Sequence, residues 1–443
     1  MRVVVVGAGL AGLRASSRLA DAGVAVTVLE GLRRVGGRVR TMRTPFVGGQ
    51  YVESGAEWVD ADHPRMLELL DRCDATLQGD GADWTTVRRM LFRDGRLFRP
   101  GELRELEPSL DADLGRYEGV IEEIAAGIAD PSRPDLHPEA ALHDARSLAD
   151  LAAEMEFGPV AGLFARRNSQ GEFAAEQSQV SLLFVAQQRA VGALLGSVTG
   201  HHSYRVEGGL DQVAAYLAAE AGPRLSQGEA AVAVSWTQDH VEVTTSTGRT
   251  INADHVVLAC ALPALRRIRF TPALPPELAR AIDELGYGTV TKTAVQYARR
   301  GWPHGFVNTT HGSQRMYEPT VDQPGELGVL MSYAGGAGGL ELAAHDEAER
   351  IRRVVADQHD LYGFDDEPIG AFSRAWSNEA NFGGSYAVYQ PGQVTRFWDV
   401  LRRPCGPIRL AGEHVATWTG YMEGALESGD RVSDEILAGR TPG

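Results

Sequence analysis

The first thirty residues restrict the fold of this chain more than any other segment. Four consecutive valines occupy residues 3–6, and a stretch rich in alanine and leucine follows at residues 13–22. A continuous β-branched run is typical of a strand buried on both faces, whereas the second stretch has the pattern of a helix that Gly23 ends. Residues 24–29 form another apolar run, closed by Glu30. The chain is therefore predicted to begin with a strand–helix–strand unit.

The turn inside this unit carries Gly7, Gly9 and Gly12. At this spacing the first glycine permits a tight turn, the second lets the backbone approach a pyrophosphate, and the third lets the helix pack closely on the strand. The N-terminus of the helix offers unpaired N–H groups to phosphates. Glu30, 18 positions after Gly12, can accept hydrogen bonds from ribose hydroxyls. The pattern predicts a dinucleotide site.

The next residues favour FAD over NAD. Gly36, Gly37 and Arg38 directly follow the second strand. Glycines with a basic residue can pass close to a pyrophosphate and neutralise it, whereas a third strand is expected there in an NAD enzyme.

The rest of the chain alternates between types of structure. We expect a helical region from about 64 to 195, a half-exposed strand with alternating pattern at 290–297, a helix at 343–361 and a closing helix at 422–437. Runs typical of parallel strands lie at the start, the middle (253–259) and the end (408–413) of the chain. An α/β domain assembled from residues 1–75, 204–285 and 376–443 is therefore predicted, with 76–203 and 286–375 forming an α+β insert.

Composition excludes several classes of function. The chain has 443 residues and a formal net charge of −16, which disfavours a nucleic-acid binder. Three widely spaced cysteines predict reduced thiols in the cytoplasm, without a disulfide framework. Neither a signal peptide nor an apolar run of about 18 residues is present, so no membrane association is expected. His201 and His202 lack a third ligand at metal spacing, and no metal site is predicted.

Lys292 is the single lysine among 43 basic residues. Because arginine supplies the other positive charges, a lysine at one position needs a reason. An ammonium group is compact and can fix a water in a way that a planar guanidinium cannot copy. A functional role for Lys292 is therefore predicted.

Motifs along nearly the whole chain resemble those of the flavin-containing amine oxidases, the monoamine and polyamine oxidase family. They begin with the glycine turn, Glu30 and residues 36–38, and continue through residues 54–58, 206–209, 255–259 and 291–293. The best match covers Trp376, residues 383–386, 411–413 and 418–425.

The resemblance implies a Rossmann-like FAD domain of the p-hydroxybenzoate-hydroxylase type and a substrate domain with a mixed sheet and helices. It implies oxidation of an amine to an imine, and then an aldehyde, with O₂ reduced to H₂O₂. A small-molecule amine and O₂ are the implied partners. A homodimer is one oligomeric state that the sequence allows.

The resemblance also assigns roles to individual residues. Tyr386 and Tyr421 would flank the substrate amine on the re face of the flavin, Lys292 would hold a water near flavin N5, and Trp376 would pack near the isoalloxazine. The implied cofactor contacts are Gly7, Gly9, Gly12, Glu30 at the ribose, Gly37, Arg38 at the pyrophosphate, Gly55 and Ala56 beside the ring, Val232 at the adenine, Glu413 near the ribityl or phosphate end, and the Met422 N–H at flavin O2.

Two positions depart from the family pattern. Ser385 stands where mammalian monoamine oxidases carry the cysteine that bonds to the flavin, and serine cannot form that thioether. Noncovalent FAD is therefore predicted. Leu32 replaces an arginine that often follows the ribose-binding acid, and Arg33 or Arg34 would have to substitute for it.

Three alternatives to a simple amine oxidase are open. An L-amino-acid oxidase of the same fold would need an arginine in the substrate pocket and would favour Trp over Tyr421. A flavin desaturase or dehydrogenase would pass its electrons elsewhere. A silent FAD-binding module would perform no chemistry.

Overall fold

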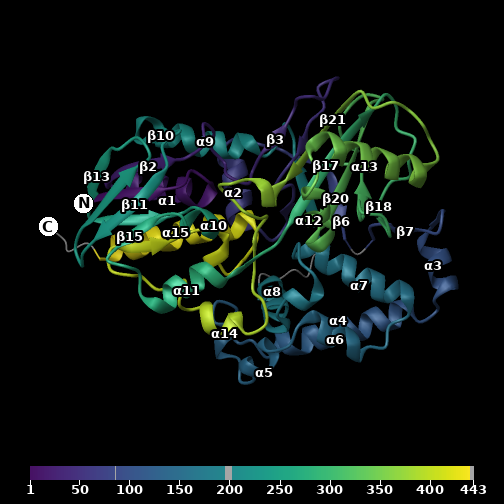
Figure 1. Ribbon diagram of the computed structural model, residues 1–443, viewed down its shortest axis with the longest axis horizontal. Helices are drawn as coiled ribbons and strands as arrows, with labels where there is room; N and C mark the ends of the chain where they lie inside the picture. The colour runs from purple at the N-terminus through teal and green to yellow at the C-terminus, as the bar shows by residue number, and fades with distance from the viewer. Residues whose placement is uncertain (85, 195–201, 440–443) are drawn as a thin grey trace.

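The computed structural model describes residues 1–84, 86–194 and 202–439 (Figure 1). Its two largest sheets have five and seven strands. In Figure 1 the five-stranded sheet and helix α15 (Met422–Ala438) lie on one side of the molecule, and the seven-stranded sheet lies on the other, above helices α4, α6 and α7. None of the helices in the described ranges is long and apolar enough to span a bilayer.

The five-stranded sheet joins distant parts of the chain and is parallel throughout. The valines of the first strand are buried, as their β-branched run predicts. Helix α1 (Leu10–Asp21) packs against both α15 and α9 (Asp211–Ala221). The strand order is β10 (Leu225–Gln227), β2 (Ala25–Glu30), β1 (Arg2–Val6), β14 (His255–Leu258) and β23 (Ile408–Leu410).

The seven-stranded sheet is mixed. Its strand order is β21 (Gly370–Ala375), β17 (Val290–Tyr297), β20 (Gly328–Gly335), β19 (Arg315–Tyr317), β18 (Phe306–Thr309), β7 (Arg89–Arg93) and β8 (Arg96–Phe98). Every residue of β17 is buried, so the predicted half-exposed strand at 290–297 is wrong. The polar residues that alternate along this strand find partners inside the protein, because β17 lies between two neighbours and both of its faces are covered.

Smaller sheets and helices complete the fold. A four-stranded sheet contains β13 (Thr250–Ala253), β12 (Val241–Thr245), β11 (Ala231–Trp236) and β15 (Arg269–Thr271), and a three-stranded sheet contains β5 (Val59–Asp60), β9 (His202–Val206) and β6 (Leu77–Asp83). The main remaining helices are α2 (Pro64–Arg72), α3 (Pro100–Leu106), α4 (Leu110–Ala126), α6 (Leu148–Glu154), α7 (Pro159–Glu172), α8 (Leu182–Leu194), α11 (Pro276–Glu284), α12 (Gly336–Ala343) and α13 (Glu347–Tyr362).

The expected helical region at 64–195 is helical only in part. Strands β6, β7 and β8 interrupt it between residues 77 and 98. The helix expected at 343–361 starts later, at Glu347, because Asp346 accepts a hydrogen bond from the Glu349 N–H and caps it.

The two large sheets do not share segments. All strands of the five-stranded sheet come from 1–75, 204–285 and 376–443, and all strands of the seven-stranded sheet come from 76–203 and 286–375. Two small sheets join both sets of segments: the β5–β9–β6 sheet, and the pair of β16 (Gly286–Tyr287) and β22 (Ala387–Val388). The division into two domains at these boundaries stays a prediction.

Candidate active site

A long cavity of about 360 Å³ brings distant predicted residues together. Its lining includes Glu30 and residues of β11 as well as Lys292 and the two tyrosines. Of the predicted site residues only Gly12 is absent from its walls. The lining includes Gly7, Gly9, Glu30, Gly37, Arg38, Gly55, Ala56, Val232, Lys292, Trp376, Tyr386, Glu413, Tyr421 and Met422.

The glycine turn is shaped to receive a phosphate. Gly7 has φ +107°, and a Cβ there would lie 2.9 Å from the Ala259 carbonyl oxygen. A Cβ on Gly12 would lie 2.0 Å from the carbonyl oxygen of Gly7, so Gly12 serves helix packing and not the cavity wall. At Gly9 a Cβ would meet only open space. Gly9 also precedes α1 and gives it no side-chain cap, which leaves the first N–H groups of the helix available to an anion.

Glu30 is held at the end of β2 by backbone donors. Its two carboxylate oxygens accept hydrogen bonds of 2.8 Å from the N–H groups of Ala8 and Leu32. Burial raises the pKa of Glu30 in spite of these bonds. Each oxygen keeps a second lone pair that a ribose hydroxyl could use. Arg34, one of two expected substitutes for the missing arginine, instead donates to the carbonyls of Val35 and Gly37.

The cavity lining contains an ion pair. Arg38 Nη1 lies 2.7 Å from Glu413 Oε1 and also donates to the carbonyl oxygen of Ser385. Glu413 further accepts hydrogen bonds from the backbone N–H groups of Ala387 and Gly420. Arg38 and Glu413 are therefore fixed in place by the protein before any ligand binds.

Gly55 and Trp376 form a narrow wall of the cavity. A Cβ on Gly55 would lie 1.9 Å from the Arg38 carbonyl oxygen and 3.0 Å from the Trp376 ring. Trp376 Nε1 donates to the Ser54 carbonyl oxygen at 2.7 Å, and its ring meets Phe382 edge-on. A larger side chain at position 55 would displace the backbone that carries this wall.

Lys292 is buried and fully hydrogen-bonded. Its Nζ lies 2.9 Å from the Gly55 carbonyl oxygen, 3.3 Å from that of Glu53, and 2.8 Å from Glu57 Oε2. A water held at Nζ would have to share one of these hydrogens. The ammonium also lies 5.9 Å from the ring of Tyr333, the residue directly opposite on β20.

Glu57 is a site residue that the sequence reasoning missed. Its carboxylate contacts Lys292, Arg205 Nε at 2.9 Å and the Tyr317 hydroxyl at 2.6 Å. Burial alone would raise the pKa of Glu57, but Lys292 and Arg205 lower it to about 2. Glu57 belongs to the motif at residues 54–58. An acidic residue directly after the glycine of this motif was the sequence signal that could have identified it as a site residue.

Glu53 is a second buried carboxylate near Lys292. It accepts hydrogen bonds from Thr41 Oγ1 and the Leu210 N–H, and its other oxygen has no partner. Burial raises the pKa of Glu53 to about 7. Unlike Glu57, this carboxylate touches no cationic side chain within ion-pair distance in the described part of the chain.

Tyr386 and Tyr421 both line the cavity, and the Tyr386 ring lies 3.4 Å from the position of a Cβ on Gly420, the residue before Tyr421. The Tyr386 hydroxyl donates to the Glu172 carbonyl oxygen at 3.0 Å and lies 3.0 Å from the Tyr333 hydroxyl. The Tyr421 ring packs edge-on against His63 and Trp418. Tyr333 was not predicted, because nothing in its local sequence distinguishes it from a core tyrosine.

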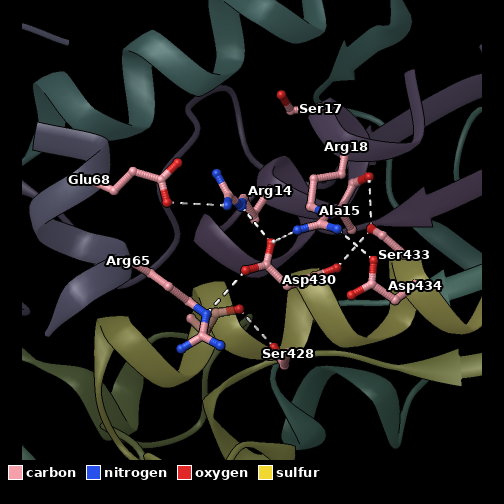
Figure 2. A network of polar contacts seen from close by, with 12 residues as sticks. Arg14, Ala15, Ser17, Arg18, Arg65, Glu68, Ser428, Asp430, Ser433 and Asp434 are labelled. Carbon is pink, nitrogen blue, oxygen red and sulfur yellow. Dashed lines mark hydrogen bonds and ion pairs between the residues drawn. The ribbon is translucent and has the colours of Figure 1, made fainter. Parts of the chain in front are cut away.

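Helix α15 begins at Met422, immediately after Tyr421, and no side chain caps it. Met422 lines the cavity, and the N-cap residue of this helix offers its N–H groups no side-chain acceptor. Figure 2 shows how the helix is held: Asp430 accepts a hydrogen bond from Arg14 of α1 at 2.6 Å and from Arg65 of α2 at 3.1 Å. These contacts fix the direction in which the helix N-terminus points.

Among the described residues, one cluster of three side chains could act as metal ligands: Asp60, Asp62 and His63. His63 Nδ1 already accepts a hydrogen bond from the Asp60 N–H, and its ring packs on Trp418 and Tyr421. The cluster is thus explained by local packing. His201 of the predicted histidine pair lies outside the described residues.

Comparison with known proteins identifies similar chains over nearly the full length. The sequence profile of the family described as flavin-containing amine oxidoreductase matches residues 10–437. An L-amino acid dehydrogenase from Synechocystis is 28% identical and covers 98% of this chain and 94% of its own. Human flavin-containing amine oxidase B is 27% identical over 98% of this chain and 86% of its own. Putrescine oxidase solved with putrescine bound has a TM-score of 0.88, 23% sequence identity and 99% coverage of both chains.

Proposed function

Because this chain belongs to the family of flavin-containing amine oxidoreductases, whose cofactor is FAD, we propose that it oxidises a primary or secondary amine. The amine loses two electrons and two protons and becomes an imine, which water hydrolyses to a carbonyl compound. Bound FAD supplies the two-electron acceptor, and O₂ then takes the electrons to give H₂O₂. The observation that carries this proposal is that Tyr386, Tyr421 and Lys292 all line one cavity, with Tyr333 between Lys292 and Tyr386.

Residues along the cavity can hold FAD from one end to the other, in a domain of the p-hydroxybenzoate-hydroxylase type. The N-terminus of α1 would bind the pyrophosphate, and Glu30 the ribose. The exposed backbone at Val232 would meet the adenine. The Met422 N–H and the positive end of α15 would favour negative charge on the reduced ring. Ser385 lines the cavity with a hydroxyl that has no partner, which is compatible with noncovalent binding.

The two tyrosines position the amine. Aromatic faces attract an ammonium by about 1 kcal/mol or more when dry, and they favour a polarisable lone pair. The Tyr386 hydroxyl is fixed between Glu172 and Tyr333, so its ring has one orientation. Burial, and then the Glu172 carboxylate, raises the pKa of Tyr421, so its phenol stays neutral at physiological pH.

Lys292 acts in the oxidative half of the reaction. A positive charge beside the ring stabilises the negative charge that develops when O₂ takes the first electron. Glu57 partly neutralises this charge, and Arg205 restores a net positive charge to the trio.

Anaerobic mixing of the purified holoprotein with a panel of amines tests the proposal. We expect loss of the yellow flavin absorbance with at least one amine, and H₂O₂ after air is admitted. If no amine or amino acid bleaches the flavin, the protein is a silent FAD-binding module. If bleaching occurs but air produces no peroxide, the enzyme is a dehydrogenase that uses another electron acceptor.

A further inference from the structure

The cavity wall carries an arginine that belongs to none of the motifs of the family resemblance. Arg267 lies between α10 (Leu262–Leu265) and β15, and its side chain is exposed and lines the cavity. Its Nη2 donates a hydrogen bond of 3.0 Å to Asn381 Oδ1, and Asn381 lines the cavity too. Two segments that are 114 positions apart in the chain therefore meet at this wall.

Arg267 differs from the other two cations of the wall in having no carboxylate partner. Arg38 Nη1 lies 2.7 Å from Glu413 Oε1. Lys292 Nζ lies 2.8 Å from Glu57 Oε2. Among the residues that the structure describes, no carboxylate lies within 4.0 Å of the Arg267 guanidinium. Its positive charge is therefore available to an anionic ligand.

The Arg267–Asn381 pair lies beside the glycine turn. A Cβ on Gly37 would lie 3.5 Å from the Gly9 Cα and 4.0 Å from the ring of Phe382, which directly follows Asn381. Gly9 precedes α1, whose first N–H groups have no side-chain cap. The pair thus stands close to the helix N-terminus that is available to a phosphate.

Cys260 gives a second, independent indication of where Arg267 lies. A Cβ on Gly7 would lie 3.1 Å from the Cys260 backbone nitrogen. Burial raises the pKa of the Cys260 thiol to about 12, nearby Glu30 raises it further, and Arg267 lowers it. Both charges therefore act on one thiol beside the glycine turn. Arg267 is close to the residues assigned to the ribose and to the pyrophosphate.

We propose that Arg267 binds the pyrophosphate of FAD and supplies its counter-charge, with Asn381 as a positioning residue. The inference rests on the placement of FAD in this cavity and not on the oxidation of an amine. A pyrophosphate carries two negative charges, whereas a helix N-terminus offers only about half a positive charge. A planar guanidinium matches phosphate oxygens through two parallel hydrogen bonds. The Asn381 amide orients this guanidinium without cancelling its charge, as a carboxylate would.

Release of FAD from the holoprotein tests the inference without a turnover assay. The dissociation rate constant is measured from the rise in flavin fluorescence after dilution to nanomolar concentration. Arg267→Met should release FAD about tenfold faster than the wild type at about 0.01 M salt. The difference should fall below about threefold at about 1 M salt, where charges are screened beyond about 3 Å.

Two further variants serve as rescue and control. Arg267→Lys should release FAD more slowly than Arg267→Met, since it keeps the charge but not the fork of donors. Arg269→Met removes the same charge from an exposed arginine two residues away that does not line the cavity. This control should release FAD at the rate of the wild type.

A second measurement separates pyrophosphate binding from a general loss of structure. The flavin-free full-length chain, used only where added FAD restores the flavin absorbance, is titrated calorimetrically with ADP and with adenosine. ADP should bind the wild type at least tenfold more tightly than adenosine. Arg267→Met should remove most of this advantage and change adenosine binding less than threefold. Asn381→Ala should remove part of the advantage in the wild type and none in Arg267→Met, because it acts through the arginine.

The possible results separate this inference from the proposed function. Equal release of FAD by Arg267→Met and Arg269→Met, or an ADP advantage that survives in Arg267→Met, would overturn the role of Arg267 and leave the proposed function standing. An equal loss of ADP and adenosine binding would also overturn it, because Arg267 would then only support the fold of the wall. A wild-type chain that carries no flavin and takes up no FAD would overturn the placement of FAD in this cavity as well.

Discussion

The buried pair of Lys292 and Glu57 permits a quantitative prediction about stability. The pKa of Glu57 is lowered from 4.5 to about 2. This difference corresponds to about 3 kcal/mol of net stabilisation of the charged carboxylate. Both side chains are at least 95% buried, so solvent screens this interaction little. Lys292→Met would leave the carboxylate with Arg205 as its remaining cation, and we expect a loss of about 3–5 kcal/mol.

A double-mutant cycle isolates the pair. Glu57→Gln removes the charge that Lys292 balances, so the variant with both substitutions should be about 2 kcal/mol more stable than the sum of the single effects implies. The assay is urea unfolding of the holoprotein at a fixed excess of FAD, because FAD binding itself stabilises the folded state. A cycle on the exposed pair Arg104 and Asp111 is the control and should show much weaker coupling.

The pH dependence of the cycle follows from the sign of the shift. A lowered carboxyl pKa contributes stability that is present above about pH 4.5 and is lost as pH falls towards 2. The coupling between Lys292 and Glu57 should therefore be full at pH 7 and should decline below pH 4.5. Additive single effects at pH 7 would refute the role assigned to this ion pair.

Three further predictions concern neighbouring residues. Lys292→Met should retain FAD and anaerobic bleaching by substrate but slow reoxidation by O₂ in stopped-flow absorbance, and unchanged turnover in air would exclude this role. Because Ser385 cannot bond to the flavin, denaturation in acid should release free yellow flavin to the supernatant, and flavin remaining in the precipitate would contradict noncovalent binding. Glu53→Gln should raise the free energy of unfolding by about 3 kcal/mol at pH 8 and by little at pH 4. The reason is that a carboxyl group with a pKa raised to about 7 lowers the stability of the folded protein as the pH rises from 4.5 through 7. A gain of equal size at both pH values would show that this carboxyl group does not titrate as described.

Local sequence patterns predicted the backbone structure around the glycine turn well. The turn at Gly7, Gly9 and Gly12, and Glu30 at the end of β2, depend on backbone requirements that a few adjacent residues specify. The closing helix was predicted at 422–437 and is found at Met422–Ala438. Such features can be recognised because residues that are close in the sequence are also close in the structure.

The surroundings of Lys292 were harder to predict because they depend on pairing across strands. The alternation of β17 indicated an exposed face, but its neighbours β20 and β21 cover it, and Lys292 points into the protein. Tyr333 reaches the site only through the register of β17 and β20. No pattern within either strand shows that it will be placed beside the other.

The attachment of α15 to α1 and α2 has a consequence for biosynthesis. The ligand cavity needs the N-terminus of α1, made first, and that of α15, which cannot form before residues 422–438 have left the ribosome. Asp430, which contacts both partner helices, is likewise synthesised long after them. A nascent chain should therefore bind FAD only after residues 422–438 have been synthesised, and a truncation before residue 420 should yield a protein that is colourless as well as inactive.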